Sequence, residues 1–349
     1  MSNERDYLFK LNGYRFDKLI GVGTYSKAFK VYSVQYDKYF CAKMTEIDDS
    51  YFDECNNPRD PELLALLNLD NPNIIKVYDY FRYEDFFCLI LEWCECGTLM
   101  DRLNNKIPLN TLSIKVIMKD ILSALVACHC LNIAHRDIKP SNIFIDTLGR
   151  AKVADFGLSE ILQNRQSTVD VACGSPSYAA PEIYGDAAYD PFKADVWSLG
   201  VTFYQMAFGQ LPWPDEITLK GPERPTPPFP QNADPNLVSI IQQMLSIEPQ
   251  FRPSMSQIEK YCYFSLYDSS METDRFRRKK SENSIRSTIS LRNVSLHQNA
   301  NLSEQSSNQG KHMVSAISRL KSLHPQLDRS RRSSAKIVAK PLTFLESDS

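Results

Sequence analysis

The sequence predicts an α+β fold with two lobes, and three observations lead to this prediction. The first part of the chain holds short β-prone runs, whereas apolar residues recur at helical spacing from Leu112 onward. The 349 residues are enough for about two compact parts of ~150 residues each. Apolar residues make up 43% and charged residues 23%, which excludes a fibrous repeat and wholesale disorder. A strand-rich part followed by a helix-rich part is typical of the α+β class.

Each expected element follows from its own pattern. The β-prone runs, which we expect to be strands, cover Tyr14–Gly21, Ala28–Tyr36, Tyr39–Met44, Ile74–Tyr83 and Phe87–Trp93. A helix is expected over Pro61–Leu69, with Leu63, Leu66 and Leu67 on one face. Longer helices are expected over Leu112–Cys130, Lys193–Phe208 and Asn236–Ser246.

Charge, apolar runs and cysteine usage exclude several classes of protein. The formal charge of −2 argues against a chain-wide surface for nucleic acid or membrane. No run approaches ~18 apolar residues, so no membrane span is expected, and the polar first residues hold no signal-peptide core. Nine cysteines, several in apolar segments, are typical of reduced thiols in a cytoplasmic or nuclear protein. Neither Cys94-Glu-Cys96 nor Cys128-His-Cys130 is expected to bind zinc.

The last part of the chain, residues 267–349, differs from the rest in composition. It contains 15 Lys and Arg against 8 Asp and Glu, a charge of +7, which leaves −9 for residues 1–266. With 18 serines in 83 residues it buries too little apolar surface to fold, so we expect a largely disordered tail. A short basic amphipathic helix is expected over 311–327, either with a regulatory partner or without one. Ser281 and Ser333 follow basic runs, where phosphate would either neutralise the basic charge or create a site for a phospho-reading partner; the alternative is an unmodified, solubilising tail.

Two glycines, Gly21 and Gly23, stand between two expected strands. Such glycines let backbone amides approach a phosphate and donate to it. A strand rather than a helix follows them, which argues against a dinucleotide-binding fold. Lys43 ends a later run, and Glu62 comes 19 residues after it on the expected short helix. A lysine that holds phosphates needs a carboxylate to fix its extended side chain, and the alternative is a pair of ordinary surface charges.

The most specific stretch is His135-Arg-Asp137-Ile-Lys139-Pro-Ser-Asn142, followed by Asp155-Phe156-Gly157. Asp155 comes 18 residues after Asp137. One carboxylate can orient a hydroxyl and accept its proton, while a second carboxylate and an amide oxygen can hold Mg²⁺ against phosphates. A chance match to this ordered set is very improbable.

With these motifs the sequence resembles the eukaryotic protein kinase family over about residues 14–266. The resemblance continues through Ala180-Pro-Glu182, Asp195-Val-Trp197-Ser-Leu-Gly200 and Phe251-Arg252-Pro253. It implies a bilobal protein kinase fold, with a β-rich N-lobe at about 14–91 and a helical C-lobe at about 96–266. It also implies that ATP and Mg²⁺ are the cofactors and that proteins are the substrates in intracellular signalling. In line with the net charge, no nucleic acid is expected as a partner.

The resemblance implies a role for each matching residue. Lys43 would bind the α- and β-phosphates with Glu62 as its ion-pair partner, Asp137 would be the catalytic base, and Lys139 would stabilise charge on the γ-phosphate. Asn142 and Asp155 would hold Mg²⁺. The remaining ATP-binding positions would be Ile20, Gly21, Val22, Gly23, Thr24, Tyr25, Ser26, Ala28, Cys41, Leu91, Glu92, Cys94 and Phe144. Among them, the hinge, which we define as residues 92–94, would present backbone groups to adenine, with Leu91 as the gatekeeper.

The same motifs indicate which residue type of the substrate is phosphorylated and which kinase subfamily the chain resembles. Lys139, two residues after the base, and Ser175 in the activation segment match the serine/threonine branch rather than the tyrosine branch. The run Cys173–Glu182 resembles calmodulin-dependent and AMP-activated kinases, whereas Asn142–Phe144 and the hinge resemble NIMA-related kinases.

The sequence departs from the family pattern around the nucleotide and at the substrate side. Alanine stands at position 28 where valine is usual, and cysteine at position 41 where alanine is usual, so the two changes compensate in volume or are drift. Phe144 replaces a leucine and would add an aromatic face against the purine. Thr98 and Ser141 are neutral where relatives that prefer arginine carry acids, although Asp101 remains acidic.

Regulation is expected to involve Arg136, because kinases with arginine before the base often require a phosphate in the activation loop. The usual acceptor position is Val171, which cannot be phosphorylated. Either the activation loop is ordered without phosphate, so that the enzyme is constitutively competent, or Thr168 carries the switch. In the first case Val171 would pack where the phosphate otherwise docks, and Asp170 would supply part of the missing charge. Elsewhere, Glu182 would pair with Arg252 to brace the segment, and Asp195 would anchor the catalytic loop backbone.

Two other functions are weighed against an active kinase. A pseudokinase or scaffold on the same fold usually lacks the lysine, the base or a metal ligand, and all of these are present here. A protein that chiefly docks to membrane or RNA through its basic tail is the weaker alternative.

Overall fold

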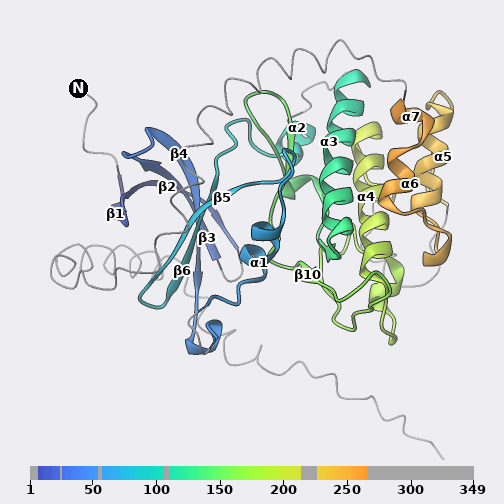
Figure 1. Ribbon diagram of the computed structural model, residues 1–349. Coiled ribbons are helices and arrows are strands. Elements are labelled where there is room, and N and C mark those ends of the chain that lie inside the picture. Colours follow the sequence, from blue (N-terminus) through green and yellow to red (C-terminus); the bar gives the residue numbers. More distant parts are fainter. Residues whose placement is uncertain (1–6, 24–25, 54–56, 106–110, 214–225, 266–349) are drawn as a thin grey trace, which may run out of the picture. The chain divides into compact units, whose positions relative to one another are not determined.

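The computed structural model of the chain describes residues 7–23, 26–53, 57–105, 111–213 and 226–265 (Figure 1). The described residues divide into two compact units, one of residues 7–18 and 30–39 and the other of the described residues within 19–29 and 40–265. Every described site residue predicted from the sequence belongs to the second unit. The expected tail helix at 311–327, as well as Ser281 and Ser333, lies outside the described residues.

The first unit contains a hairpin whose first strand was not predicted from the sequence. Strand β1 (Phe9–Leu11) pairs antiparallel with the beginning of β2 (Tyr14–Val22). Asn12-Gly13 joins them with φ values of 48° and 81°, as a two-residue hairpin turn requires. Phe9 and Phe16 stack across the pair with ring centroids 4.4 Å apart. A run of three strand residues is too short for its period to be recognised in the sequence.

In the second unit, β6 (Phe86–Glu92) pairs antiparallel with β4 (Lys38–Glu46) on one side and with β5 (Val77–Tyr83) on the other. The remaining expected strand is β3 (Ser26–Ser33). The five strands predicted from the sequence are therefore present, but β5 begins later than expected. Ile74, the expected first residue, instead forms a single parallel bridge to Val153.

The expected short helix is α1 (Pro61–Asn68), and its buried face differs from the prediction. Leu63 and Leu66 are buried, but Leu67 is 60% exposed, so its placement on the buried face was wrong. Glu62 is 2% exposed and takes a place on that face. The helix is turned so that this carboxylate, rather than a third leucine, points into the protein.

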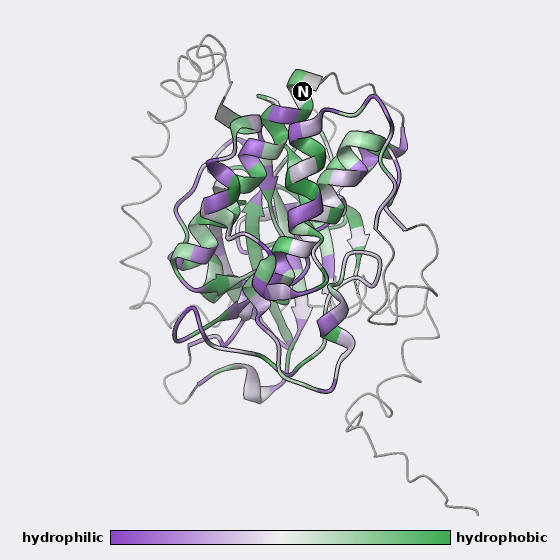
Figure 2. Ribbon diagram, turned by 90° about the vertical axis from the view of Figure 1, so that its right-hand side faces the viewer, coloured by the Kyte–Doolittle hydropathy of each residue, from purple (hydrophilic) through white to green (hydrophobic). Residues whose placement is uncertain are grey.

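The helical part contains the three long helices that the sequence predicts together with short ones. These helices are α2 (Leu99–Asn104), α3 (Thr111–Cys130), α4 (Pro191–Phe208), α5 (Pro235–Met244), α6 (Met255–Glu259) and α7 (Cys262–Ser265). Figure 1 shows α3, α4 and α5 side by side. In Figure 2 hydrophilic and hydrophobic segments alternate along the helices, as expected when one face is buried.

Close packing of α4 and α5 depends on a glycine. A Cβ added at Gly200 would lie 2.9 Å from side-chain atoms of Met244 and Leu245. Since Gly200 has no side chain, the two helices can approach closely, and Trp197 on α4 is fully buried. Among the described residues, we find no helix both long and apolar enough to cross a membrane.

Short strands and 3₁₀ turns join the longer elements. They are the strands β7 (Ile133–Ala134), β8 (Ile143–Ile145), β9 (Ala151–Val153) and β10 (Glu160–Ile161), with 3₁₀ turns η1 (Asp49–Tyr51), η2 (Pro140–Asn142), η3 (Pro181–Tyr184) and η5 (Pro249–Phe251). β8 pairs antiparallel with β9, and β10 pairs antiparallel with β7.

Candidate active site

Lys43 on β4 contacts two carboxylates that come from distant parts of the chain. Its Nζ lies 2.6 Å from Glu62 Oε2 and 2.7 Å from Asp155 Oδ1. The beginning of α1 is fixed by Asp60, whose side chain accepts a hydrogen bond from the amide of Leu63 at 2.7 Å. The helix cap and the ion pair thus place Glu62 against Lys43, and the structure brings together the pair expected from the sequence.

Lys43 and Asp155 each stabilise the charge of the other. Burial acts to lower the pKa of Lys43, but the carboxylates of Glu62 and Asp155 outweigh it and the pKa is raised. Burial acts to raise the pKa of Asp155, but the ammonium of Lys43 outweighs it and the pKa is lowered. At neutral pH the lysine is therefore a cation and Asp155 an anion.

The Asp155-Phe156-Gly157 motif is held in place by its backbone and by its aromatic ring. Asp155 has φ of 63°, an unusual conformation for a residue other than glycine. Phe156 is fully buried, its ring centroid lies 4.7 Å from that of His135, and its amide donates to Glu62 Oε1 at 3.3 Å. A Cβ added at Gly157 would lie 3.7 Å from Lys43 Nζ, so this glycine borders the cluster.

The catalytic loop is anchored by Asp195 on α4, as expected from the sequence. Its Oδ2 accepts from the amide of His135 and its Oδ1 from the amide of Arg136, both at 2.8 Å. His129 Nε2 lies 2.9 Å from Oδ2 of the same carboxylate. Arg136 has φ of 66°, a strained conformation that these contacts hold.

Asp137 receives hydrogen bonds at both carboxylate oxygens. Lys139 Nζ donates to Oδ2 at 2.6 Å and Asn142 Nδ2 donates to the same oxygen at 3.0 Å. Ser175 donates to Oδ1 from its amide at 3.0 Å and from its hydroxyl at 2.9 Å. Lys139 Nζ also donates to the Ser175 hydroxyl at 2.6 Å. The structure therefore brings together four of the predicted residues and fixes the orientation of the carboxylate.

The oxygen atoms near Asp137 fit a Mg²⁺ ion held jointly with phosphates. The amide nitrogen of Asn142 donates to the backbone carbonyl and to the carboxylate of Asp137, so its Oδ1 is the atom that can bind a cation. The Asp155 side chain is 46% exposed. In the described part of the chain, no three His, Cys, Asp or Glu side chains form a metal cluster. Mg²⁺ is commonly bound by one or two protein oxygens together with substrate phosphates. Asn142 Oδ1 and the Asp155 carboxylate match this coordination.

Three residues expected around the adenine, Cys41, Leu91 and Phe144, belong to the apolar core or pack against it. Cys41 on β4 lies opposite the gatekeeper position Leu91 in the pairing with β6. Burial raises the pKa of the Cys41 thiol to about 12 and that of the Cys94 thiol to about 12, so both are neutral. Phe144 on β8 is partly buried and packs against the core.

The glycine-containing turn lies between β2 and β3. The amide of Gly23 donates to the carbonyl of Ser26 at 2.8 Å and closes the turn, while Ile20 and Val22 are exposed. A Cβ added at Gly21 would lie 3.7 Å from that of Ala28. Thr24 and Tyr25, which were also expected to bind ATP, lie outside the described residues.

Arg136 has partners that were not predicted. Its Nη1 donates to Glu160 Oε2 at 2.6 Å and its Nη2 donates to the carbonyl of Val171 at 2.7 Å. The side chain of Val171 is 62% exposed, so the expectation that it packs in place of a phosphate was wrong. Asp170, expected to supply the negative charge, is exposed, and the carboxylate that meets Arg136 is Glu160. Glu160 on β10 is better placed than Asp170 to meet Arg136, because β10 pairs directly with β7, the strand before the catalytic loop.

The activation segment is also held by Tyr189. Val169 and Tyr189 exchange two backbone hydrogen bonds, at 3.0 and 2.8 Å, and the Tyr189 hydroxyl donates to the carbonyl of Val171 at 3.1 Å. Thr168, the alternative switch residue, is exposed beside this bridge. A Cβ added at Gly174 would lie 2.7 Å from the carbonyl of Arg136, so only glycine allows this approach.

Glu182 and Arg252 form the expected pair. The guanidinium donates to both oxygens of the carboxylate, at 2.6 and 2.8 Å, and it lies over the Trp197 ring at 4.9 Å. Arg252 is 1% exposed and also donates to the carbonyls of Ser246, Lys193 and Ile247.

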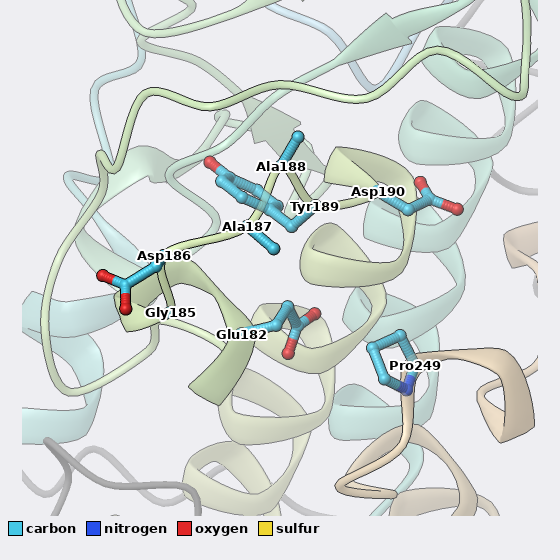
Figure 3. A pocket seen from close by; sticks show the side chains of 8 residues that line it. All are labelled: Glu182, Gly185, Asp186, Ala187, Ala188, Tyr189, Asp190 and Pro249. Atoms are coloured by element: carbon cyan, nitrogen blue, oxygen red, sulfur yellow. The ribbon is translucent and has the colours of Figure 1, made fainter.

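A mainly apolar pocket beside this pair is shown in Figure 3 and is lined by Glu182, Gly185, Asp186, Ala187, Ala188, Tyr189, Asp190 and Pro249. It shares none of the residues around Asp137.

Asp101, the acidic residue that remains near the hinge, is engaged in a helix cap. Its Oδ2 accepts from the amide and the hydroxyl of Thr98, at 2.8 and 2.7 Å, and the Thr98 hydroxyl in turn accepts from the amide of Asp101. This capping box at the beginning of α2 uses the carboxylate for local structure.

Two residues of the site, Glu160 and Tyr189, were missed from the sequence, as was Lys152, a buried lysine that pairs with Glu92 of the hinge. Glu160 follows Asp155 closely, but a single acidic residue carries no pattern that distinguishes it from a surface charge. Lys152 could have been singled out because it stands between apolar residues in Ala151–Ala154, where an exposed lysine is not expected.

Comparison with known proteins agrees with this arrangement. Residues 14–264 match the family described as protein kinase domain. The chain is 30% identical over 259 residues to a probable cell cycle serine/threonine-protein kinase CDC5 homolog of Encephalitozoon cuniculi, covering 72% of this chain and 54% of that protein. It is 28% identical to CBL-interacting serine/threonine-protein kinase 7 of Arabidopsis thaliana, covering 81% of this chain and 67% of the relative.

A third relative is the mitosis inducer protein kinase cdr2 of Schizosaccharomyces pombe, 30% identical over 59% of this chain and 27% of that protein. The chain thus spans about half of the first of these relatives and about a quarter of the third. Because the family match covers most of the described residues, the chain belongs to the protein kinase domain family.

Proposed function

We propose that this chain is an ATP-dependent protein serine/threonine kinase. The observation that supports it most is the carboxylate of Asp137, which accepts a serine hydroxyl while Lys139 donates to the same hydroxyl. The family match and the names of the relatives support the same activity. The names say nothing of the substrate of this chain.

On the nucleotide side, Lys43 carries the positive charge that would meet the α- and β-phosphates. Glu62 holds the lysine extended, because its carboxylate is buried and 2.6 Å from Nζ. Asn142 and Asp155 would hold Mg²⁺ through their oxygens. MgATP supplies the phosphoryl group when bound.

On the hydroxyl side, Asp137 would orient the substrate hydroxyl and accept its proton as the oxygen bonds to the γ-phosphorus. The bond from that phosphorus to the β,γ-bridging oxygen breaks and ADP leaves. Lys139, which is 2.6 Å from Asp137 Oδ2, would offset the charge that develops on the transferred group. The Ser175 hydroxyl already makes the pair of contacts that a substrate hydroxyl needs, which supports a serine or threonine acceptor.

The pseudokinase alternative receives less support. A silent binding module needs none of these groups, yet Lys43, Asp137, Asn142 and Asp155 are all present in the contacts described above. We further propose that substrates are chosen without a strong arginine preference, since Asp101 is occupied by its helix cap.

We also propose a cellular compartment for the protein and a function for its tail. The eight described cysteines are reduced, which supports a cytoplasmic or nuclear protein. The +7 tail at 267–349 would bind a regulatory or phospho-reading partner, with phosphate at Ser281 or Ser333 as the signal. Phosphate mapping on protein from its native cells tests this, and both serines found unmodified would contradict it.

The direct test of the proposed activity is phosphate transfer from labelled ATP to a degenerate serine/threonine peptide library in the presence of Mg²⁺. We expect the purified chain to label peptides at serine or threonine and Lys43→Met to abolish the labelling. Lys38→Met is the matched control, because Lys38 lies exposed on the same strand. Absence of labelling by the wild type, with nucleotide still bound, would favour the pseudokinase.

A further inference from the structure

A fully buried lysine on β9 has no part in the chemistry described so far. The side chain of Lys152 is 0% exposed, and that of Glu92 is 19% exposed. The ammonium of Lys152 lies 2.9 Å from Glu92 Oε1 and 3.0 Å from Oε2, so it meets both oxygens of one carboxylate. Lysine is almost never fully buried unless it is paired with an opposite charge, and for Lys152 that charge is the carboxylate of Glu92.

The pair joins two strands that lead to different parts of the nucleotide site. Glu92 is the last residue of β6 and the first of the hinge, and its amide donates to the carbonyl of Lys76 at 2.8 Å. Lys152 lies opposite Phe144 in the β8–β9 pairing, and the chain reaches Asp155 three residues later. The ion pair therefore connects the expected adenine-binding segment to the strand before the metal-binding carboxylate.

Other charges nearby do not replace this contact. Asp146, at the end of the same hairpin, pairs with Arg150 at 2.6 Å. The Cys94 thiol in the hinge has its pKa raised to about 12, mainly by burial, and is neutral. Glu92 is thus the carboxylate that the Lys152 ammonium meets at ion-pair distance.

Stability alone does not account for such a pair. Removing two charges from water costs about as much as their attraction returns, and well-packed apolar residues commonly serve as well or better. What an apolar pair does not supply is charge-assisted hydrogen bonds, and those from Lys152 to both oxygens of Glu92 hold the two strands at a fixed distance.

We propose that Lys152 and Glu92 are positioning residues for adenine recognition. The contact holds the backbone of residues 92–94 at a fixed place relative to the strand that carries Phe144, so that the hinge carbonyl and amide groups face the edge of the purine. The proposal rests on the proposed nucleotide-binding function and adds the residues that set its base specificity.

The test uses the full chain and measures affinity for ATP and for GTP by competition with a fluorescent ADP analogue, together with the melting temperature. Lys152→Met and Glu92→Gln break the pair and should lower the melting temperature and weaken ATP binding about fivefold. The double variant Lys152→Met/Glu92→Leu leaves no unpaired charge, so its melting temperature should return toward that of the wild type. Its ATP affinity should stay weak, and its preference for ATP over GTP should fall about fivefold.

Arg150→Met is the matched control, because it breaks a second buried ion pair, the one with Asp146, in the same hairpin. We expect it to lower the melting temperature and to leave the ATP-to-GTP preference unchanged. Recovery of both stability and ATP preference in the double variant would show a purely structural pair and overturn the proposal. If the double variant does not fold, an unchanged ATP-to-GTP preference in Glu92→Gln overturns it instead. A wild-type chain that binds no nucleotide would refute the proposed function itself, which is a different result.

Discussion

The guanidinium of Arg136 lies 2.6 Å from the carboxylate of Glu160. The arginine side chain is 8% exposed and stands next to Asp137, so an unpaired charge here would disturb the catalytic loop. The carbonyl of Val171 accepts a second hydrogen bond from the same guanidinium at 2.7 Å. The cation beside the base therefore has its counter-charge within the chain, without a phosphate.

This relationship predicts an enzyme that works without phosphorylation of its activation segment. Glu160→Gln should lower phosphate transfer about tenfold, because it removes the charge that holds Arg136. Asp170→Ala and Thr168→Ala should leave activity within about twofold, since neither side chain contacts the guanidinium. Activity is measured before and after phosphatase treatment. Loss of activity on dephosphorylation, reproduced by Thr168→Ala, would make Thr168 the switch.

The pair between Arg252 and Glu182 predicts a large effect on stability. Arg252→Met removes one partner of a buried pair and leaves the Glu182 carboxylate without its counter-charge. We expect the free energy of unfolding to fall by about 3–5 kcal/mol in urea denaturation. Lys260→Met, an exposed cation nearby in sequence, is the control and should change stability by less than about 0.5 kcal/mol. Similar small losses in both variants would show that the buried pair contributes little.

The volume relation between positions 28 and 41 remains a prediction. Ala28→Val should overpack the nucleotide site at a cost of roughly 1 kcal/mol in ATP affinity. The double variant Ala28→Val/Cys41→Ala should recover that affinity, because the second change removes the sulfur atom. A double-mutant cycle for ATP binding measures the coupling, and strictly additive effects would mean that the two side chains do not compensate.

The cysteines should differ sharply in reactivity. Burial raises the pKa of the Cys41 and Cys94 thiols to about 12, while Cys96 and Cys262 are exposed. At pH 8 the buried thiols remain protonated, so iodoacetamide should modify Cys96 and Cys262 first and reach the other two only after denaturation. Mass spectrometry of tryptic peptides follows each site, and early modification of Cys41 would show an open nucleotide site.

Motifs with fixed spacing predicted most of the site. The Asp137, Asn142 and Asp155 positions and the Glu182–Arg252 pair could be recognised because each belongs to a run of several specific residues. Lys43 with Glu62 could be proposed because one stands on a strand and the other on a helix with a clear apolar face.

The rest depended on contacts that no local pattern encodes. Glu160 and Lys152 are single charged residues whose partners lie 24 and 60 positions away. The buried face of α1 was misread at Leu67, because Glu62 was not expected to occupy that face. Strand β1 and the two-residue strands β7 and β10 are too short for a period-two pattern to be seen.

The most direct test of Asp137 as the catalytic base compares phosphate transfer by Asp137→Asn with its ATP affinity. We predict that turnover falls by about a hundredfold or more, since the variant keeps the side-chain volume but loses the proton acceptor. Affinity for ATP and the melting temperature should remain near those of the wild type, because Lys43 and Asp155 are untouched. Near wild-type phosphate transfer by a clean preparation of Asp137→Asn would contradict the assignment of Asp137 as the base.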